Sequence, residues 1–189
     1  MRRLFAIAGL LALVAANSRA ETPSISLLDF GATPFAQKAT NKLREHLNAS
    51  QAFKIADPDL ARAAAKGFGY SGSLNLTVIE ARDLGAALAT DLYVLGDAQT
   101  LRRSSFSQPV YYESYCSIFV VSARTGRLVS WERPRFESVQ AAQAEEGLFR
   151  ELGSDRLIQR LLATIRAVRE IEEAQRMILA SHPDRKSVV

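Results

Sequence analysis

Three short apolar runs alternate with segments of helical periodicity, and this alternation constrains the fold more than any other feature of the sequence. The runs are Ser24–Phe30, Phe53–Ala56 and Asp91–Asp97. Runs of this length, bounded by Gly, Pro or Asp, are typical of buried strands. Strands separated by helices are expected to run parallel in one sheet on which the helices pack. The sequence therefore predicts an α/β fold.

The segments between these runs carry helix signals. After Pro34, apolar residues recur every four positions, which predicts an amphipathic helix to about Ala49. Asp57 is a candidate N-cap with Pro58 at the first helical position, so a second helix is expected over Asp59–Lys66, ending at Gly67. Spaced apolar residues indicate a third helix: Leu76, Ile79, Leu84 and Leu88.

The second half of the chain begins with a hairpin. Leu101–Gln108 is polar and basic, and is expected to be a connection. Val110–Ala123 then predicts a long strand, with Arg124–Arg127 as its turn and Leu128–Glu132 as its antiparallel partner. Pro134 indicates an edge position or the end of pairing.

A long helical region closes the chain. It covers Val139–Leu179, with a break expected near Gly153–Asp155. Its apolar stripe could pack either on the chain's own domain or against a neighbouring molecule. The whole pattern predicts one domain over residues 21–180, with a mixed sheet of about five strands and helices packed on it. Residues 181–189 are expected to form a flexible tail.

The first twenty residues resemble a secretory leader. Two arginines precede thirteen uncharged residues, Leu4–Ala16, and small residues, Ser18 and Ala20, precede a cleavage point at Glu21. A membrane anchor is the alternative, but thirteen residues are fewer than the roughly 20 that a spanning helix needs. We therefore expect cleavage after Ala20 and a periplasmic or secreted protein. Loss of the leader's three arginines changes the formal charge from +4 to +1, which argues against a nucleic-acid partner.

Few residues suggest catalysis. Cys116, the single cysteine, lies in an apolar run and is expected to be a buried, inert thiol. Gly67, Gly69 and Gly72 spell a glycine motif, but it follows a helix instead of opening one, so no nucleotide cofactor is predicted. A small serine hydrolase using Ser71 or Ser73 is an alternative hypothesis, although its base would have to come from the two histidines, His46 and His182. No metal site is predicted.

Aromatic and basic residues near the hairpin are the best candidates for binding. Tyr111 and Tyr115 lie four residues apart and share one face of the predicted strand, whereas Tyr112 points to the other face. These tyrosines and Trp131 either belong to the core or mark a protein-binding surface. Four arginines, which are either solvated or bind an anionic partner or lipid headgroup, complete the candidate set: Arg102, Arg103, Arg133 and Arg135.

A series of short sequence motifs occurs in a fixed order along the chain. It begins with Ile25–Phe30, continues with Ser50–Asp57 and Ala81–Gly96, and ends with Ala123–Trp131. This series resembles the TolB amino-terminal domain and the related CsgG- and LpoB-type periplasmic folds. The resemblance implies a non-catalytic protein of the cell envelope that binds other envelope proteins. The sequence lacks the lipid-anchor cysteine of several relatives, so their individual functions do not transfer.

Three hypotheses follow. The first is an accessory protein that recognises another envelope protein through the sheet edge, the tyrosine-rich strand or the basic residues; strand addition at an exposed edge is one route. The second is the serine hydrolase, and the third is a structural subunit of a larger envelope assembly. Self-association and a peripheral contact with a membrane remain open at this point.

Overall fold

The computed structural model describes residues 22–107 and 109–181. The expected signal peptide and all of the expected tail except Ser181 lie outside the described residues. The strands are β1 (Ser24–Leu27), β2 (Lys54–Ile55), β3 (Leu92–Arg103), β4 (Tyr111–Ser122), β5 (Leu128–Glu132) and β6 (Arg135–Ser138). The helices are α1 (Pro34–Ala49), α2 (Pro58–Phe68), α3 (Val78–Leu88), α4 (Ala141–Leu152) and α5 (Asp155–Ser181).

The strands form one mixed sheet with the order β2-β1-β3-β4-β5, and β6 also pairs with β4. β1 is parallel to both of its neighbours, β2 and β3. β4 is antiparallel to each of its partners, β3, β5 and β6. The α/β fold with helices packed on a mixed sheet is therefore confirmed. The parallel strands are those that helices separate in the sequence, as expected.

The first two helices begin where the sequence predicts, and the third begins at a capping box that was not predicted. The Thr33 side chain accepts a hydrogen bond from the N–H of Ala36, and Asp57 caps α2 through the N–H groups of residues 59 and 60. Thr77 and Glu80 form a reciprocal capping box at the start of α3. The expected end of α2 at Gly67 is wrong, because the helix continues to Phe68 and ends at Gly69, whose φ of 87° is left-handed.

The structure differs from the predicted strands at two strand ends, and it contains one strand that was not predicted. β1 ends at Leu27 and not at Phe30, whose N–H donates to the Thr40 hydroxyl. The expected connection from Leu101 to Gln108 is also partly wrong, because β3 continues to Arg103 as a partner of β4. β6 was not predicted at all.

β5 and β6 occupy the same side of β4, one after the other. β5 pairs with β4 at Ile118–Val121 and β6 pairs with it at Tyr112–Tyr115. Pro134 lies between the two strands, and its carbonyl accepts a hydrogen bond from the N–H of Cys116. The proline, which has no N–H to donate, thus interrupts the edge without leaving β4 unpaired there.

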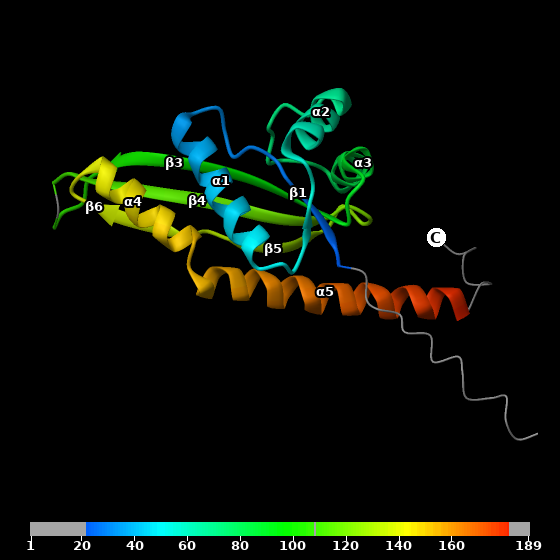
Figure 1. Ribbon diagram of the computed structural model, residues 1–189. Coiled ribbons are helices and arrows are strands. Elements are labelled where there is room, and N and C mark those ends of the chain that lie inside the picture. Colours follow the sequence, from blue (N-terminus) through cyan, green and yellow to red (C-terminus); the bar gives the residue numbers. More distant parts are fainter. Residues whose placement is uncertain (1–21, 108, 182–189) are drawn as a thin grey trace, which may run out of the picture.

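Helices cover the two faces of the sheet unequally. On one face, α1, α4 and α5 enclose the larger core with residues such as Val94, Ile118 and Val120. On the other face, α2 and α3 cover a smaller core around Tyr93, Leu95 and Val121. In Figure 1, α1 and α4 cross the long strands, while α2 and α3 gather at one end of the sheet. Because β3 and β4 are 12 residues long, they extend beyond the part that α2 and α3 cover.

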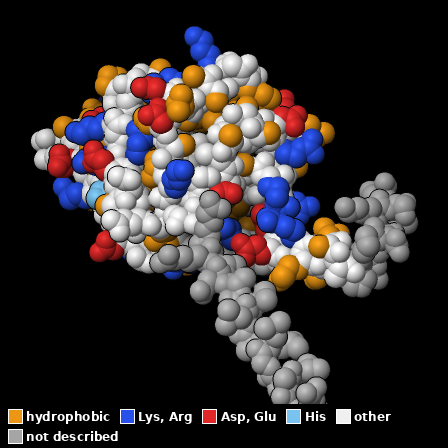
Figure 2. Space-filling model, turned by 45° about the vertical axis from the view of Figure 1, so that its right-hand side comes forward, with side chains coloured by type: hydrophobic (Ala, Val, Ile, Leu, Met, Phe, Trp, Pro, Cys, Tyr) orange, Lys and Arg blue, Asp and Glu red, His pale blue; other side chains and the backbone are white. Residues whose placement is uncertain are grey.

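The break that the sequence predicts between the last two helices is confirmed at Gly153 and Ser154. The first half of α5 packs on the sheet, and Leu157, Leu161 and Ile165 are buried there. Its second half projects beyond the sheet (Figure 1) and exposes apolar side chains. Figure 2 shows hydrophobic side chains along this projecting end, beside a group of basic ones. The expected tail is corrected at one residue, because Ser181 still belongs to the helix.

Candidate functional site

The uncovered part of the second sheet face carries the richest set of polar and aromatic side chains. We call it the open face. Strand pairing places its residues in cross-strand rows: Leu101, Glu113 and Glu137; Gln99, Tyr115 and Arg135; Asp97 and Ser117; Phe119 and Trp131; and, at the far end, Arg103 and Tyr111. Arg133, between β5 and β6, reaches over the same face, because its guanidinium lies above the Tyr115 ring.

An aromatic pair forms one end of the open face. Phe119 and Trp131 are direct cross-strand partners, and their rings stack with centroids 6.3 Å apart and planes inclined by 12°. Phe119 also contacts the small core, so it supports the tryptophan from below. Trp131 nevertheless remains 59% exposed. A rigid aromatic ring with most of its surface in water is suited to contact with another molecule.

Tyr115 occupies the middle of the open face. The Arg133 guanidinium lies 4.3 Å from the centre of its ring, in a cation–π contact. The Tyr115 hydroxyl donates a 3.3 Å hydrogen bond to the Asp97 carboxylate. Burial and the neighbouring carboxylate both raise the pKa of Tyr115, so the phenol stays protonated and remains a donor at physiological pH. Tyr115 thus joins β3 to the segment between β5 and β6.

A nearly buried carboxylate links the remaining arginines. Glu113 lies 3.0 Å from the Nε of Arg103 on one side and 3.8 Å from the Nη1 of Arg135 on the other. Its side chain is only 8% exposed, because these longer side chains lie around it. Arg135 also lies 4.0 Å from Glu137 on its own strand. The charges on the open face therefore alternate, and the arginines are held in place.

The structure brings together four of the five residues singled out as a partner-binding surface. Tyr111, Tyr115, Trp131 and Arg103 all lie on the open face. The fifth is a correction: Arg102 pairs with Tyr112 and lies on the opposite face, because β3 continues through this position and successive side chains alternate. The sequence left open whether the tyrosines belong to the core or to a protein-binding surface. In the structure Tyr115 is largely buried, whereas Tyr111 and Tyr112 are half-buried.

Sequence reasoning missed two members of this surface, Phe119 and Glu113. Both lie an even number of residues from Tyr115 in a continuous strand, so the period of two could have placed them on its face. The expected basic patch also differs from the prediction. Arg103 and Arg135 are joined by Glu113, while Arg102 is separated from them by the sheet.

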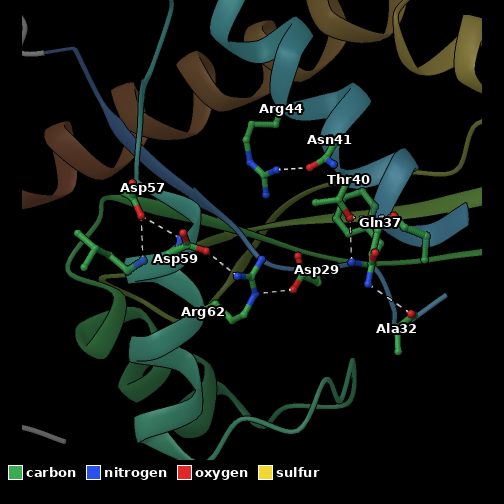
Figure 3. Close-up of polar contacts among 12 residues, drawn as sticks. Asp29, Ala32, Gln37, Thr40, Asn41, Arg44, Asp57, Asp59 and Arg62 are labelled. Carbon is green, nitrogen blue, oxygen red and sulfur yellow. Dashed lines mark hydrogen bonds and ion pairs between the residues drawn. The ribbon is translucent and has the colours of Figure 1, made fainter. Parts of the chain in front are cut away.

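A cavity of about 450 Å³ opens at the carboxyl ends of the parallel strands. Arg62 is one of its lining residues, 3.1 Å from Asp29 and 2.7 Å from Asp59, and Figure 3 shows it between these two carboxylates. Ser71 lines this cavity, but no histidine is among its described lining residues, and His46 packs against Gly153. Among the described residues, the geometry therefore gives Ser71 no histidine base, and the other candidate base, His182, lies outside them. The hydrolase hypothesis gains no support from this geometry.

A reactive cysteine, a metal site or a membrane-spanning helix would also bear on function. Cys116 is fully buried, and burial raises the pKa of its thiol, as expected for an inert cysteine. Within residues 22–107 and 109–181, no three side chains of the types that bind metals come together. In the same part of the chain, no helix combines the length and apolarity needed to cross a membrane.

Comparison with known proteins gives structural matches only. No protein-family model and no curated protein matches the sequence. A hypothetical protein from Chlamydia trachomatis, CT253, superposes with a TM-score of 0.52 at 10% identity, over 77% of this chain and 99% of CT253. This match shows a shared fold.

Two further solved structures match more loosely. The C-terminal domain of LpoB from Salmonella enterica has a TM-score of 0.43 at 13% identity, over 60% of this chain and 82% of that domain. Lipoprotein GNA1162 from Neisseria meningitidis has a TM-score of 0.41 at 11% identity, over 80% of this chain and 99% of the lipoprotein. LpoB, which the sequence resemblance names, is thus among the matched structures. The TolB and CsgG parts of that resemblance stay predictions.

Proposed function

We propose that this chain is a non-catalytic accessory protein of the cell envelope that binds another envelope protein through the open face. The observation that carries this proposal is the row of aromatic and arginine side chains on a sheet face that α2 and α3 leave uncovered. Tyr, Trp and Arg are the residues that dominate the binding energy of protein interfaces.

The open face is also preorganised. Trp131 is stacked on Phe119, Arg133 lies on Tyr115, and Arg103 is held by Glu113. Side chains that are already ordered lose little conformational entropy when a partner binds, so their contacts contribute more of their gross energy to affinity. The alternating charges favour a partner with a complementary pattern of charges, and they disfavour wrong partners.

The envelope location rests on the leader-like first twenty residues of the sequence. An exported chain would meet proteins of the periplasm or the cell surface. The proposed partner is therefore one of these, and its identity is for the experiment to determine.

The test is photo-crosslinking in cells, with the probe placed in turn at Trp131, Tyr111 and Gln159. Gln159 is an exposed position on α5, away from the open face, and serves as the matched control. We expect the first two probes to capture the same envelope protein and the control probe to miss it. Capture of the same proteins from all three positions would contradict the proposal.

Two substitutions sharpen this test. Trp131→Ala removes the exposed ring, whereas the control Ile171→Ala removes an exposed apolar side chain of α5, which packs on the opposite face of the sheet. We expect Trp131→Ala to reduce capture from Tyr111 by at least about tenfold, because a central aromatic commonly contributes about 2 kcal/mol or more. Ile171→Ala should leave capture unchanged. A crosslink from Trp131 to a second copy of the chain would instead favour the structural-subunit hypothesis.

A further inference from the structure

The apex of the β3–β4 hairpin has a composition unlike the rest of the chain. Between Leu101 and Tyr112 the sequence contains two arginines, two tyrosines and a phenylalanine, but no acidic residue. Phe106 is 109% exposed, as free of contacts as a side chain can be, and Val110 is also exposed. Transfer of such a side chain from water to an apolar environment would be favourable.

The two strands place the arginines and tyrosines directly behind this apex. Arg102 pairs with Tyr112 on one face of the hairpin, and Arg103 pairs with Tyr111 on the other. Each face of the hairpin end therefore carries one cation beside one phenol. Within the described residues Arg102 makes no ion pair, whereas Arg103 is bound to Glu113.

The apex lies at one end of the sheet. In Figure 1 this is the end opposite the projecting end of α5, and none of the described helices reaches over it. An apolar tip followed by a belt of arginines and tyrosines matches the order of layers at a membrane surface. There, apolar side chains enter the acyl boundary, tyrosines lie at the headgroups, and arginines meet the phosphates.

We propose that the hairpin apex binds the surface of a bilayer rich in anionic lipids. Phe106 would insert at the boundary of the acyl chains, and Arg102 would lie at the headgroup phosphates. Charge complementarity argues for this occupant, since no acidic residue lies between Leu101 and Tyr112, and Arg102 makes no ion pair within the described residues. Val110 and Tyr112 would add apolar and interfacial contact on the same side. This proposal is independent of the protein partner of the open face.

The test uses the full chain with an environment-sensitive fluorophore on Ser107→Cys. The native Cys116 is fully buried, so it does not compete for the label. The probes are vesicles of phosphatidylcholine alone, and vesicles with roughly one third phosphatidylglycerol to supply negative charge. We expect a blue shift and binding with the anionic vesicles only. The same fluorophore on Gln159→Cys should not shift.

Three variants locate the binding. Phe106→Ser should weaken binding by at least about tenfold, since it removes the inserting side chain. Arg102→Gln should weaken it about fivefold, the effect expected for one charge near an anionic surface. The matched control Leu60→Ser removes an equally apolar side chain that is 72% exposed on α2, and should have no effect.

Several outcomes would overturn the proposal. These are no binding, equal binding to neutral vesicles, equal binding of the wild type and Phe106→Ser, or a shift of the Gln159 fluorophore as large as that at Ser107. Equal binding of all variants would place the membrane contact elsewhere in the chain, for example in the first twenty residues. Because Trp131→Ala should not alter vesicle binding, the failure of this proposal can be told apart from that of the proposed function.

Discussion

Ser24 and Asp91 are joined by three hydrogen bonds at the start of neighbouring parallel strands. The N–H and the hydroxyl of Ser24 each donate to Oδ2 of Asp91 at 2.8 Å, and the N–H of Asp91 donates back to the Ser24 hydroxyl at 3.0 Å. The two residues are 67 positions apart in the sequence. This pair therefore fixes where β1 begins relative to β3, before the ladder of backbone hydrogen bonds starts.

The first prediction concerns the pH dependence of this pair. Burial would by itself raise the pKa of Asp91, but the hydrogen bonds from Ser24, together with the positive charges of Arg169 and Arg176, outweigh it and hold the pKa below its usual value. A carboxyl with a depressed pKa in the folded state stabilises the protein fully above its unfolded pKa of about 3.9. That contribution is lost as the pH falls through the lower, folded pKa.

Asp91→Asn should therefore lower the free energy of unfolding by about 1 kcal/mol near neutral pH. The difference from the wild type should shrink as the pH falls below about 3.9. Urea unfolding at several pH values measures both. Asp83→Asn, which changes a more loosely held surface carboxylate 3.5 Å from Arg82, is the control. A difference that grows in acid would contradict this account.

The second prediction compares two glutamates of one cross-strand row. Glu113 and Glu137 face each other across β4 and β6, but their side chains are 8% and 49% exposed. Glu113→Lys would place a third cation beside two arginines in a nearly buried position, so we expect a loss of at least about 2 kcal/mol. Glu137→Lys should change stability by less than about 0.5 kcal/mol. Similar losses for both would show that the burial of Glu113 is unimportant.

The third prediction uses two helical glycines that differ in their surroundings. A Cβ on Gly85 would lie 2.5 Å from the Cα of Ala123, so α3 could not approach β4 as closely. Gly85→Ala should lower the free energy of unfolding by about 2 kcal/mol or more, despite the better helix propensity of alanine. A Cβ on Gly67 meets nothing within 4 Å. Gly67→Ala should therefore stabilise the protein, by about 0.5–1 kcal/mol.

The fourth prediction concerns Cys116. Because only the thiolate reacts rapidly, a buried thiol with a raised pKa should resist iodoacetamide in the folded protein. Labelling should begin at the urea concentration that unfolds the chain, and mass spectrometry measures it. An exposed cysteine introduced as Gln159→Cys should react at once under the same conditions. Rapid labelling of Cys116 in the native protein would show that β4 opens locally.

The fifth prediction concerns the projecting half of α5. The buried residues of this helix end at Ile165, and Arg124 reaches only as far as Glu172. Deletion of residues 174–189 should therefore change Tm by no more than a few degrees. Leu161→Ala, in the buried half of the same helix, should cost about 2–5 kcal/mol. A large loss of stability on deletion would indicate that the projecting half has a partner in the folded state.

Local signals in the sequence predicted the elements whose ends depend on neighbouring residues. Thr33 with Pro34, and Asp57 with Pro58, each carry their own helix start, so α1 and α2 begin where expected. β6 lacks such a signal. Its single large apolar residue, Phe136, packs against Gly147 of α4, and its place in the sheet depends on β4.

The candidate surface was likewise predictable where it depends on neighbouring residues, and not where it depends on distant parts of the chain. The period of two correctly placed Tyr111 and Tyr115 on one face. It could not show that α2 and α3 stop short of Tyr115 and leave Trp131 in water, since that depends on where distant helices dock. For the same reason the sequence could not separate Arg102 from Arg103, because only the pairing with β4 extends β3 through them.

The interruption at Pro134 has a consequence for association between molecules. A continuous outer strand would offer a template on which further chains could add in succession, as in fibrils. Here the outer side of β4 is covered by two strands of five and four residues, separated by a residue without an N–H. The charged side chains of Arg135 and Glu137 on this outer strand also disfavour the addition of an apolar strand. The border that β5 and β6 form is therefore a poor template for uncontrolled polymerisation.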